Sequence, residues 1–369
     1  LNVLPAGQLG AGSVNTLMLS ITSGRAPDVA LGVEYKSPVE FAFRDAVVDL
    51  TQFADYKEVE ERFYPSIMIP YAHDGGIFAL PETMDFTVLF YRKDIVKELG
   101  LRLPNTWEDV YQEILPKLYE NSMNFCYSQL NSLPPLLFQH GGNFYKNGGT
   151  MSGLDSAEAY QAFKQWTELY TNYGIPAEAN FFTRMRNGDM PMGVANYALY
   201  VQMSTSAPEL YGRWDIAPIP GTVRKDGTVD RSVGSIAAQA GVIMEQSTHK
   251  EEAWEFLKWW TSEETQTRYG RELEALLGVE ARWNTANKNA FENLPWDKNH
   301  LSVIKNQLDE AKEQPIVLGG YFTTRHIENA WNRVVLGNEN VRDSLEQAVK
   351  DINKELRSKQ EEYGYITEE

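Results

Sequence analysis

The chain has 369 residues, of which 43% are hydrophobic and 12% aromatic, and its formal net charge is −17. This length exceeds one ordinary hydrophobic core and predicts two lobes or domains. The hydrophobic content is that of a globular chain and excludes an intrinsically disordered one. The acidic balance excludes nucleic acid as the expected partner, because phosphate binding needs clustered Lys and Arg. No apolar run approaches the ~18 residues of a membrane-spanning helix.

Cysteine and histidine usage gives no sign of a metal site. Cys126 is the single cysteine, so it forms neither an internal disulfide nor a Cys-based metal site, and we expect a buried, inert thiol. The histidines show no metal-ligand spacing; they are His73, His140, His249, His300 and His326. We predict no metal and no cofactor.

The opening segment predicts an α/β fold. Residues 1–5 already read as a strand under way, so we expect the chain to be a piece of a longer protein. Residues 14–22 carry a helical apolar stripe that includes Leu17, Met18 and Ile21. Residues 29–33 then form a continuous apolar run, which is typical of a parallel strand buried on both faces. Strand, helix and strand in this order indicate an α/β architecture.

The most informative stretch is 75–94, GGIFALPETMDFTVLFYRKD. Two short apolar runs, at 77–80 and 88–91, predict two strands separated by a polar break. Proline cannot donate to a sheet ladder, so Pro81 is expected to end the first strand. The break should then expose Glu82, Thr83 and Asp85 where a ligand could reach them.

The rest of the chain contains breaks but no long polar linker. Thr106 and Asp109 resemble a capping box before a helical stripe. The best breaks are 221–234, which contains an Asp226-Gly227 hairpin signal, and 292–300. Lobes connected by more than one chain crossing fit this pattern. From crossings near 84–90 and 233–240, we predict one lobe from 1–87 and 238–300 and another from 88–237 and 301–369.

Several segments, in order along the chain, resemble the extracellular solute-binding proteins of carbohydrate ABC importers, of the family 1, maltodextrin-binding-protein-like type. They are SGRAPDVALGV (23–33), FAFRDAVVDLTQF (41–53), the 75–94 stretch with NTWED (105–109), DMPMGVANYALY (189–200), DIAPIPG (215–221) and the run 233–266. Each segment alone is weak evidence, but the order and spacing of the segments along the chain make the resemblance strong. The resemblance implies a two-lobed periplasmic-binding-protein-like (type II) fold in which a hinge closes the lobes on a sugar.

A closer resemblance is to the solute-binding module of large multidomain Gram-positive surface proteins. It is carried by residues 1–19, 276–287 (LLGVEARWNTAN) and 318–337 (LGGYFTTRHIENAWNRVVLG). This resemblance implies an extracellular, surface-associated protein that delivers a carbohydrate to ABC permease subunits. We expect it to be a monomer.

A sugar offers apolar C–H faces to aromatic rings and hydroxyls to planar polar side chains. Loop positions provide both kinds of residue, and the candidate ligand-binding residues are Glu34, Tyr35, Glu82, Asp85, Gln129, Asn131, Asn196, Tyr197, Tyr200, Glu280, Arg282, Trp283, Tyr321 and Arg325. Each also has a structural interpretation. The loop acids and amides would then be solvated, the tyrosines would be core residues, Glu280 would pair with Arg282, and Trp283 would cover a lobe surface.

Two other classes of function stay open at this stage. A glycosidase needs two carboxylates ~5–10 Å apart across a sugar, and Glu34, Glu82, Asp85 and Glu280 could supply such a pair. A surface module for glycan adhesion or sensing could use the same cleft. The chain lacks a G-x-S-x-G elbow, a P-loop and an H-E-x-x-H motif. We predict an oligosaccharide-binding protein of an ABC importer and not an enzyme.

Overall fold

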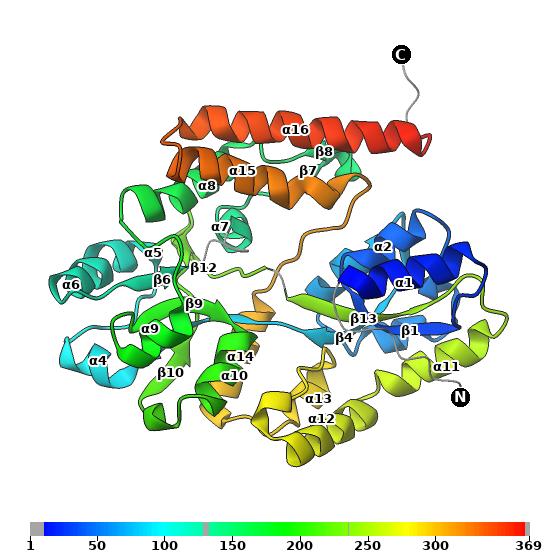
Figure 1. Cartoon of the computed structure of the whole chain (residues 1–369), viewed down its shortest axis with the longest axis horizontal. Helices are drawn as coiled ribbons and strands as arrows, with labels where there is room; N and C mark the ends of the chain where they lie inside the picture. The colour runs from blue at the N-terminus through cyan, green and yellow to red at the C-terminus, as the bar shows by residue number, and fades with distance from the viewer. Residues whose placement is uncertain (1–10, 128–132, 235, 366–369) are drawn as a thin grey trace.

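The computed structural model describes residues 11–127, 133–234 and 236–365 of the chain. Helices surround a three-stranded and a four-stranded sheet, and each of these two sheets is the centre of one lobe (Figure 1). The strand expected at residues 1–5 and the candidates Gln129 and Asn131 lie outside the described residues.

The first lobe is built around a three-stranded sheet in the order β1-β13-β4. Its elements are α1 (Ala11–Thr22), β1 (Val29–Glu34), α2 (Ser37–Ala42), η1 (Leu50–Gln52), α3 (Tyr56–Glu60), η2 (Pro65–Tyr71), β2 (Ala72–His73), β3 (Gly76–Ile77), β4 (Leu80–Met84), β13 (Ala237–Ile243), α11 (Lys250–Trp260), α12 (Glu263–Leu277), η6 (Val279–Ala281) and α13 (Lys288–Glu292).

The second lobe is built around a four-stranded sheet in the order β10-β5-β9-β6. Its elements are β5 (Thr87–Arg92), α4 (Lys93–Glu98), α5 (Trp107–Asp109), η3 (Val110–Ile114), α6 (Leu115–Glu120), β6 (Phe125–Tyr127), α7 (Leu133–Gln139), β7 (Tyr145–Lys146), η4 (Asn147–Gly149), β8 (Met151–Ser152), α8 (Ala157–Thr171), α9 (Phe181–Asn187), β9 (Met192–Asn196), α10 (Tyr197–Thr205), η5 (Pro208–Leu210), β10 (Trp214–Ala217), β11 (Thr222–Val223), β12 (Val229–Asp230), α14 (Lys298–Asp309), η7 (Gly320–Phe322), α15 (Thr323–Val335) and α16 (Val341–Glu362).

The expectation of a parallel strand at 29–33 is wrong. β1 pairs with β13 in antiparallel register, and β13 pairs with β4 in the same way. β13 belongs to the chain as it returns from the second lobe, so it runs against both neighbours. Leu31 is 39% exposed, so the continuous apolar run does not mark burial on both faces. Among the named strands that the structure describes, the parallel pair is β6 with β9.

The expectation that Pro81 ends a strand is also wrong. Pro81 lies inside β4 and is opposite Ala240 of β13. β4 is the outer strand of its sheet in the described chain, and an edge strand tolerates a residue without an N–H group. Strand pairing therefore continues through Glu82 and Thr83, which are 3% and 9% exposed. The break is shorter than expected and consists of Asp85 and Phe86.

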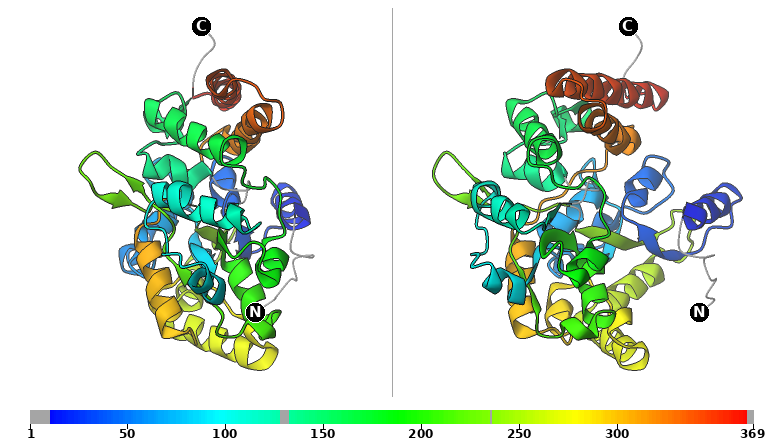
Figure 2. Two further views of the ribbon diagram at one scale, coloured as in Figure 1. Left: turned by 90° about the vertical axis from the view of Figure 1, so that its left-hand side faces the viewer. Right: turned by 60° about the vertical axis from the view of Figure 1, so that its left-hand side comes forward.

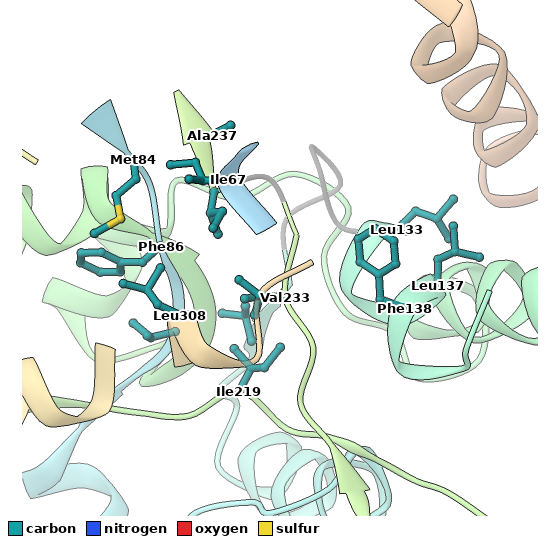
Figure 3. Packing of buried hydrophobic residues seen from close by; sticks show 14 of the residues in the cluster. Ile67, Met84, Phe86, Leu133, Leu137, Phe138, Ile219, Val233, Ala237 and Leu308 are labelled. Atoms are coloured by element: carbon teal, nitrogen blue, oxygen red, sulfur yellow. The ribbon is translucent and has the colours of Figure 1, made fainter. Parts of the chain in front are cut away.

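The chain passes from the first sheet to the second at Asp85–Phe86 and returns to the first sheet where β13 begins (Figure 1). Apolar side chains fill the space beside these crossings: Met84, Phe86, Val233 and Leu308 belong to the buried core there (Figure 3). A third segment, residues 310–319, connects α14 to α15. The crossings are thus packed against one another, which suits a defined hinge better than a loose linker.

Several local predictions are confirmed. The helix expected at 14–22 is α1, and Thr106 with Asp109 forms a capping box at the start of α5. The Asp226-Gly227 signal makes the turn of the β11–β12 hairpin, which projects from the body of the molecule (Figure 2). Cys126 is buried in β6. None of the described helices is long and apolar enough to cross a membrane.

Candidate functional site

A cavity of about 80 Å³ lies between the two lobes, and we call it the interlobe cavity. On the first lobe it is lined by Tyr35, Lys36 and Glu40, at the end of β1 and on α2. On the second lobe its lining comes from α7, β7, α8, the 313–317 segment, η7 and α15. It brings candidate residues of both lobes, Tyr35 and Tyr321, to the same space.

Tyr35 is the first-lobe aromatic of this cavity. Its position is fixed by the backbone, because its N–H donates to the carbonyl of Ala238 at 3.0 Å. Burial raises the pKa of the Tyr35 phenol, and the carboxylates of Glu313 and Glu34 raise it further. The hydroxyl therefore stays protonated and can donate a hydrogen bond. Lys36 places its ammonium 5.4 Å from the centroid of the Tyr35 ring.

Tyr321 is the second-lobe aromatic, and its side chain is 73% exposed. The preceding glycines allow the backbone to approach β7 closely: a Cβ at Gly320 would lie 2.7 Å from the Tyr145 hydroxyl, and Gly319 has φ +82°. A larger residue would clash there, so the glycines permit the tight turn that leads into η7, where Tyr321 lies just before α15. An exposed ring at a cavity wall is suited to stacking on a sugar face.

Behind Tyr321, a buried hydrogen-bond network fixes the cavity wall. The Tyr145 hydroxyl donates to Thr323 Oγ1 at 2.8 Å and accepts from Gln314 Nε2 at 3.0 Å. Burial raises the pKa of Tyr145, while the bonds to Thr323 and Gln314 lower it. The network connects β7, the 313–317 segment and the first residue of α15, so the polar groups at this wall are oriented before any ligand arrives.

Glu313 ties the cavity to the crossing segments. It is 7% exposed, and its Oε1 accepts from the backbone N–H groups of Ala237, at 2.8 Å, and Ile236. These neutral donors hold the carboxylate without removing its charge. Sequence reasoning missed Glu313, as it missed Lys36, Glu40 and Tyr145. An acid two residues before a proline was the only signal for Glu313, and it is too common to identify a site.

Other candidate residues lie around Asp85, where the chain crosses into the second lobe. Asp85 accepts three hydrogen bonds there: from the N–H of Tyr197 at 3.0 Å, from the N–H of Phe86 at 2.7 Å and from Asn196 Nδ2 at 2.9 Å. Burial raises the pKa of Asp85, and these donors oppose the rise. The carboxylate therefore fixes the first turn of α10 against the crossing.

Arg282 completes this group. The Tyr197 hydroxyl donates to the Arg282 carbonyl at 2.7 Å, which connects α10 of the second lobe to the segment after η6 of the first. The guanidinium makes two hydrogen bonds with Glu274, at 2.8 and 2.6 Å, and lies 4.7 Å from the centroid of the Trp296 ring. Arg282 does not pair with Glu280, which is exposed, because Glu274 on α12 occupies its fork. We call Asp85, Asn196, Tyr197, Arg282 and Trp296 the crossing cluster.

Glu82 is buried and has internal partners for both oxygens. Oε2 accepts from the N–H of Gly32 at 2.6 Å, and Oε1 accepts from Trp260 Nε1 at 2.7 Å. Burial raises the pKa of this carboxyl, and both donors lower it. The expectation of an exposed Glu82 is therefore wrong, because strand pairing carries it into the first lobe. Its evident role is to join β4 to β1 and α11.

Trp283 and Tyr200 also have partners within the chain. Trp283 Nε1 donates to Gln266 Oε1 at 2.7 Å, and its ring is 5.2 Å from that of Tyr269. Tyr200 is 4% exposed, and its hydroxyl is 2.9 Å from His300 Nδ1, whose Nε2 is 3.0 Å from Asp215 Oδ1. Burial raises the pKa of Tyr200 to about 12.

Two further candidates are exposed and lie outside the lining of the interlobe cavity. Glu34 is at the end of β1, beside Tyr35. Arg325 is in the first turn of α15, with its guanidinium 4.3 Å from the centroid of the Phe322 ring. In the described part of the chain no group of three or more His, Cys, Asp or Glu side chains is arranged to hold a metal ion.

Comparison with known proteins agrees with this architecture. The sequence profile of the bacterial extracellular solute-binding proteins matches residues 6–267. The chain belongs to this family. Its relatives include the arabinooligosaccharide-binding proteins of Halalkalibacterium halodurans and Bacillus subtilis, each 25% identical over 299 and 297 residues, or 75% and 76% of the chain. The chain spans 64% and 65% of the length of these two relatives.

Solved structures show the same fold. The sugar-binding protein MalE from Xanthomonas citri has a TM-score of 0.79 at 18% identity, covering 96% of this chain and 89% of that one. An ABC substrate-binding protein from Listeria monocytogenes in complex with cycloalternan has a TM-score of 0.69 at 20% identity, covering 92% and 87%. The predicted two-lobed α/β fold of the periplasmic-binding-protein type is therefore confirmed.

Proposed function

We propose that the chain binds an oligosaccharide in the interlobe cavity and delivers it to the permease subunits of an ABC importer. The observation that carries the proposal is that Tyr35 of the first lobe and Tyr321 of the second line one cavity. Oriented polar groups lie beside them, at Glu313 and Gln314. Aromatic rings together with a few convergent polar groups are what a sugar site needs. Membership of a family of extracellular solute-binding proteins also supports the proposed binding of a solute.

Binding without turnover is part of the proposal. The relatives are binding proteins. Within the crossing cluster, Asp85 accepts three hydrogen bonds from its own chain, so it is poorly placed to act as a glycosidase carboxylate. The protein is proposed to work as a monomer at the outer surface of a Gram-positive cell.

Ligand binding is proposed to close the lobes by rotation about the crossings. The proposed lobes are 1–87 with 238–300 and 88–237 with 301–369. α14 packs against β10 and β5 of the second sheet, which favours moving the second boundary back to Asp297. In this proposal the chain crosses between the lobes at Asp85–Phe86, between β4 and β5, and again just before β13.

Calorimetry and thermal unfolding with arabinotriose, maltotriose, cellotriose and galactotriose test the proposal. A ligand that binds the folded state raises the melting temperature with its concentration. We expect at least one trisaccharide to do so, and chromatography of the mixture should recover it unchanged. Release of shorter sugars would favour the enzyme interpretation, and no binding by any of the four would contradict the proposed function.

A further inference from the structure

The two lobes line the interlobe cavity with different chemistry. Tyr35, Lys36 and Glu40 of the first lobe each end in a group that forms hydrogen bonds. Among the described lining residues, the aliphatic side chains all come from the second lobe, and we call them the aliphatic wall. The aliphatic wall consists of Leu133 and Pro134 of α7, Pro315, Ile316 and Val317 of the 313–317 segment, and Ile327 of α15.

Part of the aliphatic wall is not covered by the core. Pro134, Pro315 and Ile316 are half-buried, whereas the other three residues are buried. The three half-buried residues come from two segments far apart in the sequence, and both segments line the same cavity. The folded chain therefore offers apolar surface to whatever occupies this space.

An unsubstituted sugar matches the aliphatic wall poorly. Its hydroxyls need hydrogen-bond partners, and a hydroxyl that leaves water for an aliphatic surface loses them. Its C–H faces prefer flat aromatic rings, which Tyr35 and Tyr321 already provide in the same cavity. Aliphatic side chains gain most from another apolar group, because the contact removes the surface of both from water.

The size of the cavity limits such an apolar group. One water molecule needs roughly 10–15 Å³ of cavity space. The interlobe cavity, with about 80 Å³, therefore has room for a group that displaces several waters. A compact acetyl group fits this description, whereas a long acyl chain exceeds the space.

We infer that the protein recognises an acetylated oligosaccharide, whose acetyl methyl group packs against the aliphatic wall. The inference rests on the proposed function, since it names the ligand class of the same site. The sugar hydroxyls meet the hydrogen-bonding side chains of the cavity, and Tyr35 and Tyr321 stack on the ring faces. An ester and an amide present the same methyl group, so the acetyl group is carried by either an oxygen or a nitrogen of the sugar.

The test starts from each trisaccharide that binds among arabinotriose, maltotriose, cellotriose and galactotriose. Calorimetry compares it with derivatives in which one hydroxyl is converted to an O-acetyl ester, and with derivatives in which one hydroxyl is replaced by an acetamido group. At least one acetyl derivative should bind roughly tenfold tighter than its parent, because its methyl group leaves water and no hydroxyl faces the aliphatic wall. The set that contains the tighter ligand distinguishes the ester from the amide.

A carbamoyl group provides the matched ligand control. It has the shape of an acetyl group, with an NH₂ group in place of the methyl group. The carbamate or urea that corresponds to the tighter acetyl derivative should lose the gain in affinity, because its N–H donors face an aliphatic surface.

A pair of protein variants assigns the gain to the aliphatic wall. Ile316→Thr keeps a branched Cβ but places a hydroxyl on the wall, and it should lower the ratio of acetylated to parent affinity several-fold. Val223→Thr should leave this ratio unchanged, because Val223 is 55% exposed on β11 and lies outside the cavity lining. Both affinities of a ratio are measured on the same variant, so a loss of stability alone does not change it.

Three results would each overturn the inference and leave the proposed function standing. They are acetyl derivatives that bind no tighter than their parent, a carbamoyl derivative that binds as tightly as the acetyl one, and equal affinity ratios in the two variants. If no trisaccharide binds at all, the proposed function fails and the inference falls with it.

Discussion

The crossing cluster and the interlobe cavity are both polar, aromatic and close to the crossings, yet they differ in where their hydrogen bonds go. In the crossing cluster, Asp85 and Arg282 are each bonded to other parts of the chain. In the cavity, Glu313 and Gln314 are bonded within the chain as well, but Tyr321 is exposed and Glu328 makes no ion pair with another described residue. The comparison teaches that a polar residue at a strand break is a poor guide to a ligand when its bonding capacity is already used within the protein.

The largest expected effect comes from Arg282, which forms an ion pair with Glu274. The side chains of Arg282 and Glu274 are 7% and 12% exposed. Arg282→Met should lower the free energy of unfolding by about 3–5 kcal/mol, because it leaves a buried carboxylate unpaired. Urea unfolding measures this change. Arg325→Met is the control, since that guanidinium is exposed. If Arg282→Met keeps full stability and loses ligand affinity, the crossing cluster is the sugar site after all.

Glu82 provides the second test. In Glu82→Gln, an amide N–H₂ must face either the N–H of Gly32 or the indole N–H of Trp260. Leaving one buried donor unsatisfied should cost about 1–3 kcal/mol of folding free energy. Glu34→Gln, at an exposed position, should change stability by less than about 0.5 kcal/mol. Equal stability of the two variants in chemical unfolding would show that Glu82 does not join β4 to β1.

The two tyrosines of the cavity are tested by measuring the ligand affinity of variants that keep the folding stability of the wild type. Tyr35→Ala and Tyr321→Ala should each weaken binding of the trisaccharide found above by roughly tenfold, because a stacking ring contributes about 0.5–1.5 kcal/mol beyond its buried area. Tyr211→Ala is the matched control, since Tyr211 is 92% exposed and lies outside the cavity lining. If calorimetry gives the same affinity for all three variants, Tyr35 and Tyr321 do not belong to the binding site.

The smallest effect is the pH dependence of Glu82. Its pKa is raised in the folded protein by burial, so the folded state holds the proton more tightly than the unfolded chain does. The stability contributed by this group is therefore complete below the unfolded pKa and is lost as pH rises through the folded pKa, with a slope of at most about 1.4 kcal/mol per pH unit. The stability difference between the wild type and Glu82→Gln should fall as pH rises above the ordinary glutamate pKa of about 4.3. A difference that grows with pH would show that hydrogen bonds, not burial, dominate this carboxyl.

Local patterns predicted much of the fold. Thr106 and Asp109 predicted a capping box, and Asp226-Gly227 predicted a hairpin, because such signals act over a few residues. The direction of strand pairing could not be obtained in this way. A continuous apolar run such as 29–33 is compatible with either direction, and only the return of the chain through β13 made its pairing antiparallel.

What the sequence determined by itself was the family, the two-lobed α/β architecture and the presence of a polar break between two strands. The family and the type of fold follow from the resemblance of ordered segments to a known family, whereas chain length, element order and short-range signals gave two lobes, the α/β class and the break. The tertiary structure alone decided which polar side chains have internal partners. Glu82 is 50 residues from Gly32, and Tyr197 is 85 residues from Arg282, so no local pattern could reveal that these bonds exist. The same is true of the interlobe cavity, because Tyr35 and Tyr321 come to one space only when both lobes are folded and the crossings fix their relative position.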